Sequence, residues 1–152
     1  MTGQCFCGGV AFEFDGPVSN IEFCHCTRCQ RATGSAFSAE FRVRAEDFRW
    51  LRGQELISHC DAPVLREPPG YRRAFCKNCG SQVPIGFPGN PVIAIPTGLV
   101  DGPIPARAID HIWVSKKASW LDLSEIGALP QYDEEPTSES QHQSLMGPLK
   151  LK

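Results

Sequence analysis

Clustered cysteines constrain this chain more than any other feature of its sequence. Seven of its eight cysteines lie in three short clusters: Cys5 and Cys7, then Cys24, Cys26 and Cys29, then Cys76 and Cys79. Disulfides between cysteines this close in sequence would be strained or redox-active, whereas closely spaced thiols in a reducing compartment are typical of metal ligands. The clusters therefore predict two zinc sites, one with four thiolates and one with three.

The first and third clusters predict a closed, structural site. In a Cys-x-Cys or Cys-x-x-Cys turn, two thiolates hold one ion, and a glycine after the second cysteine permits the positive φ that such a turn needs. Both turns have that glycine, and together they provide the tetrahedral ligand set Cys5, Cys7, Cys76 and Cys79. Thiolates select zinc or an iron–sulfur centre, and we expect zinc because no redox partner is in view. The alternatives are that the two pairs serve separate sites or form a disulfide.

The middle cluster predicts a functional zinc with an open position. It offers only the three ligands Cys24, Cys26 and Cys29, which we expect one tight loop to present. Structural zinc is saturated by protein ligands, whereas a zinc that takes part in chemistry keeps a position for substrate or water. His59 or Cys60 would close the site if either supplied a fourth ligand. His25 stands between two ligands, so we expect its ring to point away from the metal. It would then either donate a hydrogen bond to a ligand or lie at the surface.

The charge of the middle cluster indicates what it would bind. Three thiolates give Zn²⁺ a formal charge of about −1, which suits the binding of a soft thiol better than the ionisation of water. A fourth thiolate would add a charge that backbone N–H groups or cations must offset. Arg28 and Arg31 lie close enough in sequence to do this, or to bind a substrate carboxylate. The alternative is that both are ordinary exposed arginines.

Length and charge exclude several other classes of protein. A chain of 152 residues predicts one domain, and a net charge of −2 gives no basic field for nucleic acid or an anionic membrane. No apolar run approaches the roughly 20 residues of a membrane span, and residues 1–15 do not resemble a signal peptide. We therefore expect a cytoplasmic protein with a zinc-binding domain over residues 1–132. Residues 133–152 predict a polar tail whose last four residues alternate and could add to a sheet edge.

The remaining sequence predicts an all-β fold. Period-two alternation marks residues 10–15 and 37–44 as half-buried strands, and residues 92–96 and 109–114 are further strand candidates. Residues 45–51 fit either a helical turn or a strand. A short helix capped by Ser124 is expected over residues 124–129. The 14 Gly and 13 Pro favour turns over long helices.

These motifs resemble the family of glutathione-dependent formaldehyde-activating enzyme and centromere protein V. The resemblance extends from about Gly3 to Tyr132 and includes the three cysteine clusters in order. Its further motifs are Thr33-Gly34-Ser35-Ala36-Phe37, Arg73-x-Phe75, Gly98-x-x-Asp101, His111-Ile112 and Ala118-Ser119-Trp120.

The resemblance implies a β-tent fold with two zinc ions per chain. It implies that the four-cysteine zinc is structural and the three-cysteine zinc functional, and that the activity is carbon–sulfur lyase chemistry joining glutathione to formaldehyde, or the reverse. We then expect the substrate thiolate at the fourth position of the second zinc, with His25 relaying a proton. The alternative is a non-catalytic, zinc-stabilised module that binds another protein.

Overall fold

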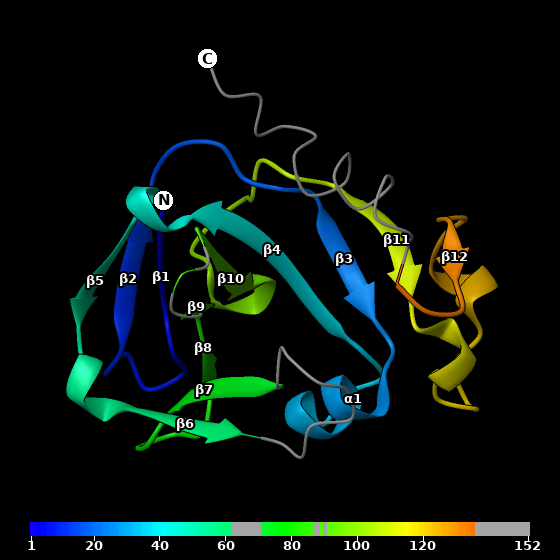
Figure 1. Cartoon of the computed structure of the whole chain (residues 1–152), viewed down its shortest axis with the longest axis horizontal. Helices are drawn as coiled ribbons and strands as arrows, with labels where there is room; N and C mark the ends of the chain where they lie inside the picture. Colours follow the sequence, from blue (N-terminus) through cyan, green and yellow to red (C-terminus); the bar gives the residue numbers. More distant parts are fainter. Residues whose placement is uncertain (62–70, 87–88, 90, 136–152) are drawn as a thin grey trace. The chain divides into compact units, whose positions relative to one another are not determined.

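Short strands dominate the structure, as the alternating sequence predicts (Figure 1). The computed structural model describes residues 1–61, 71–86, 89 and 91–135. The chain divides into two units, which are described separately. Unit 1 comprises Met1–Gly16 and Val43–Pro103, and unit 2 comprises Pro17–Arg42 and Ile104–Lys152. Across the described residues there is one α-helix, of seven residues, so the prediction of a β protein is confirmed.

Unit 1 contains antiparallel strand pairs. One sheet has the order β1-β2-β5, a second has the order β6-β7-β8, and β9 pairs with β10. The strands are β1 (Thr2–Gln4), β2 (Ala11–Phe14), β5 (Phe48–Arg52), β6 (Ile57–Asp61), β7 (Arg72–Cys76), β8 (Gln82–Val83), β9 (Ile85–Gly86) and β10 (Val92–Pro96). Three short 3₁₀ helices, η1 (Ala45–Asp47), η2 (Gln54–Leu56) and η3 (Thr97–Leu99), lie between them.

Unit 2 is built on parallel as well as antiparallel pairing. Its strands are β3 (Ile21–Cys24), β4 (Ser38–Arg44, whose last two residues belong to unit 1), β11 (Ala108–Ile112) and β12 (Gln131–Tyr132). Strand β11 pairs in parallel with both β3 and β12, and β3 pairs antiparallel with β4. The helix α1 (Thr27–Thr33) connects β3 to β4, and the 3₁₀ helices η4 (Val114–Lys116) and η5 (Leu123–Ile126) follow β11 (Figure 1).

The core of unit 1 includes two of the predicted metal ligands. A cluster of buried residues contains Cys5, Val10, Ala74, Cys76, Val83 and Ile85. Beside it, Phe12 of β2 stacks on Phe48 of β5 and meets Trp50 edge-on. In β2, period-two alternation directs the buried Phe12 and Phe14 to one face of the strand.

Most of the predicted strands are confirmed, with local corrections. Residues 45–51 adopt both of the expected alternatives, because η1 is followed directly by β5. The strand expected over 109–114 ends at Ile112, since Trp113 takes a positive φ of 60°. The helix expected over 124–129 is instead the four-residue 3₁₀ helix η5, and its cap is Asp122, whose side chain accepts from the N–H of Ser124. The helix α1 was not predicted.

The C-terminal part of the predicted tail, residues 136–152, lies outside the described residues. The boundary expected at residue 132 therefore stays a prediction. Among the residues that are described, no helix has the length and apolar character that crossing a bilayer requires.

The turn between β5 and η2 depends on a glycine in unit 1. Gly53 has a φ of +76°, in the left-handed region that side chains rarely occupy. A Cβ atom at this position would lie 2.1 Å from the carbonyl oxygen of Gly9. Because that oxygen belongs to the backbone, it cannot move aside as a flexible side chain could. The close approach joins this turn to the segment that follows the first cysteine pair.

We predict that Gly53→Ala destabilises the protein by more than about 2 kcal/mol, because it adds backbone strain to a steric clash. Gly98→Ala is the matched control, since a Cβ there meets nothing within 4 Å. The measurement is urea unfolding of the zinc-loaded proteins. Equal free energies of unfolding for the two variants would contradict the prediction.

Candidate metal centres

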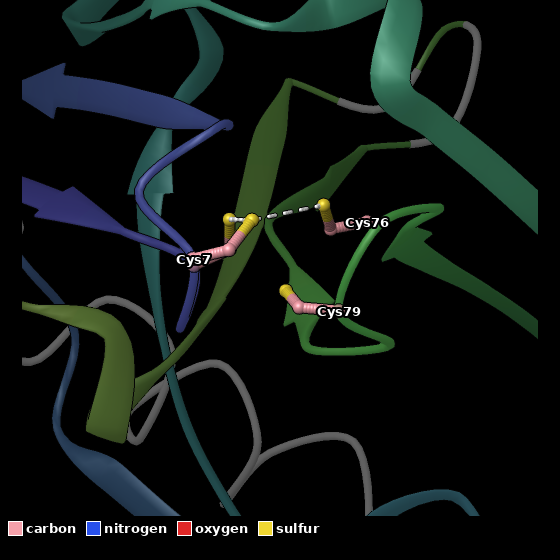
Figure 2. A group of neighbouring side chains, drawn as sticks. Cys7, Cys76 and Cys79 are labelled. Atoms are coloured by element: carbon pink, nitrogen blue, oxygen red, sulfur yellow. Dashed lines mark hydrogen bonds between the residues drawn. The ribbon is translucent and has the colours of Figure 1, made fainter.

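The four cysteines of the predicted closed site converge in unit 1. Cys5 and Cys7 lie in the turn between β1 and β2, whereas Cys76 ends β7 and Cys79 lies in the turn before β8. Their four sulfur atoms all lie within 4.8 Å of one another. Figure 2 shows the side chains of Cys7, Cys76 and Cys79 pointing toward one another from the two turns. Two segments far apart in sequence thus form one ligand set.

Both turns have the backbone geometry expected of metal-binding knuckles. The N–H of Gly8 donates to the carbonyl of Cys5 at 2.9 Å, and the N–H of Gly80 donates to the carbonyl of Cys76 at 2.8 Å. Gly8 and Gly80 have φ values of 70° and 74°, so the glycine after each second cysteine does take the positive φ. The sequence therefore predicts this local geometry correctly.

The spacing of the sulfur atoms fits a tetrahedral ion and excludes a disulfide. The Sγ atom of Cys7 lies 3.6 Å from that of Cys5 and 3.9 Å from that of Cys76. A tetrahedron with Zn–S bonds of about 2.3 Å has edges of about 3.8 Å, whereas a disulfide bond is about 2.05 Å long. All eight cysteines are free. Hydrogen bonding to the Ser81 side chain and N–H lowers the pKa of Cys79 to about 6, which favours a thiolate ligand.

The three cysteines of the predicted open site converge in unit 2, on β3 and α1. Cys24 ends β3, Cys26 is the N-cap of α1, and Cys29 lies in the first turn of that helix. Their sulfur atoms also lie within 4.8 Å of one another. We expected one tight loop to present all three, and that expectation was wrong for Cys29. A helical turn positions it instead, because residues three apart lie on the same face of a helix.

Backbone N–H groups stabilise negative charge on this sulfur group. The Sγ atom of Cys26 accepts from the N–H of Cys29 at 3.4 Å. The pKa of Cys26 is lowered to about 2, mainly because the thiols of Cys24 and Cys29 donate to its sulfur, with the N–H groups of Cys29 and Arg28 adding to the effect. The same interactions raise the pKa of Cys24. Metal binding would release the thiol protons that remain on this group.

The other residues predicted at this site differ in how far they are exposed to solvent. Arg28 is half-buried on α1, and Arg31 is exposed in the last turn of that helix. His25 is fully buried, and its Nε2 atom lies 2.8 Å from Nδ1 of His111. Burial, followed by the charge of His111, lowers the pKa of His25 to about 4, so the ring is neutral at pH 7.

The two predicted candidates for a fourth ligand lie in unit 1. His59 and Cys60 are exposed residues of β6, paired in register with Ala74 and Arg73 of β7. Within the part of the chain that the structure describes, the group of possible ligands in unit 2 consists of the three cysteines.

The sequence did not reveal a buried ionic row beside Cys24. Asp110 of β11 pairs in register with Glu22 of β3, and Glu22 forms a salt bridge with Arg42 at 2.5 Å. Asp110 is 4% exposed, and its Oδ1 atom has no hydrogen-bond partner among the described residues. Within β3, the side chains of Glu22 and Phe23 point to opposite faces of the sheet. The parallel neighbour that buries this row comes from 88 positions further along the chain, at Asp110.

A cavity of about 460 Å³ in unit 1 is lined by residues that include none of the clustered cysteines. Its wall includes Phe48, Trp50, Ile57, Ile85 and Ile93, with His59 and Gln54 among its polar residues. Mostly apolar cavities of this size with a few polar groups are typical of small-molecule sites. The aromatic residues come from β5, whose strand character the sequence left undecided.

The fold and the two sulfur groups define a mostly β protein with two cysteine clusters that could each hold a metal ion. The profile of the family described as glutathione-dependent formaldehyde-activating enzyme matches residues 1–116. The chain belongs to this family, and the resemblance found in its motifs is confirmed.

A solved structure supports the fold assignment. The crystal structure of a Rhodobacter sphaeroides protein, determined as a structural genomics target, has a TM-score of 0.53 and 19% sequence identity to this chain. The alignment covers 86% of this chain and 99% of that protein. At this identity the similarity concerns the fold alone. A comparison with curated proteins finds no match.

The buried ionic row predicts a pH-dependent stability. Burial, followed by the charge of Glu22, raises the pKa of Asp110 to about 6 from an ordinary value of 3.8, and Arg42 opposes the shift. Because the folded-state pKa is the higher one, the protonated carboxyl stabilises the fold. This contribution is complete below about pH 4 and is lost as pH rises through about 6.

We predict that Asp110→Asn, which keeps the shape without the charge, is more stable than the wild type above pH 6, by on the order of 1–2 kcal/mol. The advantage should shrink as pH falls toward 4. Urea unfolding of both proteins at matched metal content, from pH 4.5 to 8, measures it. A difference of constant size across this range would show that the carboxylate charge is not its cause.

Proposed function

We propose that this protein is a zinc-dependent carbon–sulfur lyase acting on a small thiol adduct, such as that of glutathione with formaldehyde. The observation that carries the proposal is the difference between the two sulfur groups. Four sulfurs converge in unit 1, which completes a tetrahedral ligand set, whereas three converge in unit 2. An incomplete set of protein ligands is the arrangement of zinc sites that take part in chemistry. Membership of a family named for this activity supports the same conclusion.

The reaction forms or breaks one carbon–sulfur bond. In the direction of synthesis, the sulfur of the thiol attacks the aldehyde carbon, the carbonyl electron pair moves to oxygen, and the proton lost by the thiol is balanced by one gained at that oxygen. The product is an S-hydroxymethyl thiol, and the reverse reaction releases thiol and aldehyde. A Zn²⁺ ion held by Cys24, Cys26 and Cys29 would lower the pKa of the substrate thiol and favour its thiolate.

The residues around the sulfur group supply charge balance and orientation. The N–H groups at the start of α1 point toward Cys26 and offset the negative charge that three thiolates bring. Arg28 and Arg31 extend this positive character along the helix, and we assign them to the carboxylates of a substrate such as glutathione. His25 is fully buried, so a direct proton relay to substrate would require its ring to leave His111. We therefore give His25 a supporting role instead of the relay.

Zinc is the proposed cofactor, with one ion at each sulfur group and two per chain. Free thiols at all eight cysteines fit a reducing compartment, and on this ground we propose a cytoplasmic location. A net charge of −2 supports a small-molecule partner and favours neither nucleic acid nor an anionic membrane surface.

A non-catalytic binding module is the second candidate. Phe6, at the tip of the first cysteine turn, is 93% exposed, and large exposed apolar side chains are frequent at sites of protein contact. The C-terminal leucines and methionine that suggested such a role in the sequence lie outside the described residues. An exposed aromatic at a metal-stabilised turn would present a rigid contact point. The two candidates differ in whether the second metal accepts an external thiol.

We predict that glutathione changes the visible and near-ultraviolet spectrum of the Co²⁺-substituted protein saturably, because its thiolate completes the ligand set at the three-cysteine site. Cys26→Ser should lose the metal at this site, the spectral response and any lyase turnover, while keeping the fold and the first metal. Cys60→Ser is the matched control and should respond like the wild type if Cys60 is not a ligand.

Two outcomes would contradict the proposal. Loss of both metals in Cys26→Ser would show that the sites are not divided into one structural and one functional centre. A spectrum typical of four protein ligands at both sites, unmoved by glutathione, would favour the binding module. If Cys60→Ser or His59→Ala then opened the site to thiols, the altered residue would be the fourth ligand.

A further inference from the structure

Two imidazoles form a buried pair in unit 2 to which the proposed reaction assigns no catalytic step. Nε2 of His25 and Nδ1 of His111 are 2.8 Å apart, and both residues are 0% exposed. One ring must donate and the other accept, so a single proton lies between the two nitrogen atoms. A hydrogen bond between desolvated groups is costly to lose, because the partner left behind finds no water.

The pair is part of a three-point attachment of His25. Its backbone N–H donates to the carbonyl of Ile112 at 2.9 Å, and its carbonyl accepts from Nε2 of Gln30 at 2.7 Å. The ring bonds to His111. Two of the three contacts thus come from β11 and one from α1. They fix both the backbone and the side chain of the residue that separates two metal-ligating cysteines.

The orientation of the His25 ring determines where the neighbouring sulfurs lie. His25 packs among aromatic rings, with the centroid of Phe37 at 5.2 Å and that of His111 at 5.1 Å. Cys24 and Cys26 are half-buried, and their sulfurs gather with that of Cys29. Successive side chains of an extended segment point in opposite directions. A ring held inward at His25 therefore turns the sulfurs on either side of it outward.

We propose that His111 is a positioning residue of the three-cysteine metal site. Its hydrogen bond to His25 fixes the rotation of the segment from Cys24 to Cys26 and so sets the spacing of the three sulfurs. The proposal rests on the part of the proposed function that places a metal at these cysteines, and it does not depend on the reaction. No catalytic step is assigned to His111.

The test is a Co²⁺ titration of His111→Phe in the absence of thiol and aldehyde. Phenylalanine keeps a ring in the aromatic cluster and removes the hydrogen bond. We expect the affinity of the second site for Co²⁺ to fall about 10- to 100-fold, as is usual when a group that orients a metal ligand is removed. Its absorption bands should change, while the four-cysteine site loads normally. His111→Asn, whose side-chain amide can replace Nδ1, should recover most of the affinity and the bands.

Phe37→Leu is the matched control for packing. It removes the ring that packs against His25 and Phe23 but leaves the hydrogen bond between His25 and His111 in place. The control should lower the free energy of unfolding and leave Co²⁺ affinity and spectrum close to those of the wild type. Equal losses of Co²⁺ affinity in Phe37→Leu and His111→Phe would overturn the proposal, because general loosening of the core would then explain both.

Co²⁺ binding by His111→Phe that equals that of the wild type would also overturn the proposal that His111 positions the three-cysteine site. If that variant does not fold, His111→Met, which likewise removes the hydrogen bond, takes its place with the same criterion. The outcome is separate from that of the proposed function. If His111→Phe binds Co²⁺ like the wild type and the wild type has lyase activity, only the positioning role of His111 is contradicted. If Co²⁺ binding by His111→Phe is altered and the wild type has no lyase activity, only the proposed lyase function is contradicted.

Discussion

The convergence of four sulfurs in unit 1 is the constraint on which its structure depends. Two turns separated by 68 residues of chain, from Cys7 to Cys76, must bring their thiols to within 4.8 Å of one another. Cys5 and Cys76 also belong to the hydrophobic core, so the metal centre and the packed interior share residues. A shift in the β1–β2 turn therefore affects both the ligand geometry and the core contacts of Val10. Metal binding and folding of this unit are expected to be coupled.

A metal at the three-cysteine site would constrain the chain much less than one at the four-cysteine site. Its ligands span six residues, so binding a metal there closes only a short loop and removes little conformational entropy from the unfolded chain. Closing the much longer loop between the two turns of unit 1 removes more conformational entropy from the unfolded chain. An ion at the four-cysteine site would therefore stabilise the fold more than an ion at the three-cysteine site. On the proposed function, an ion at the three-cysteine site could exchange a ligand at little cost to the stability of the fold.

Local features of the sequence predicted the local features of the structure. The cysteine spacings predicted both sulfur groups and the positive φ of Gly8 and Gly80. Alternation predicted β2 and β4, and the bounding Gly and Pro residues predicted β10. The helix α1 was missed because its seven residues carry three polar side chains and two arginines but only one buried residue, Cys29. His111 was missed as a partner of His25 because the parallel pairing of β3 with β11 joins segments 86 residues apart. A single sequence gives no local signal for such a pairing.

That long-range pairing explains how a surface site can depend on a buried residue. Strand β3 ends at Cys24, and the ring of the next residue, His25, is buried in unit 2. There it forms a hydrogen bond with His111 of β11, and the backbone N–H of His25 donates to the carbonyl of Ile112. On the positioning role proposed for His111, the histidine between the sulfurs sets the direction in which they point. A change in the packing around β11 would then alter the spacing of the three sulfurs without contact to any of them. The chemistry of this site is therefore a property of the sheet beneath it as well as of the three cysteines.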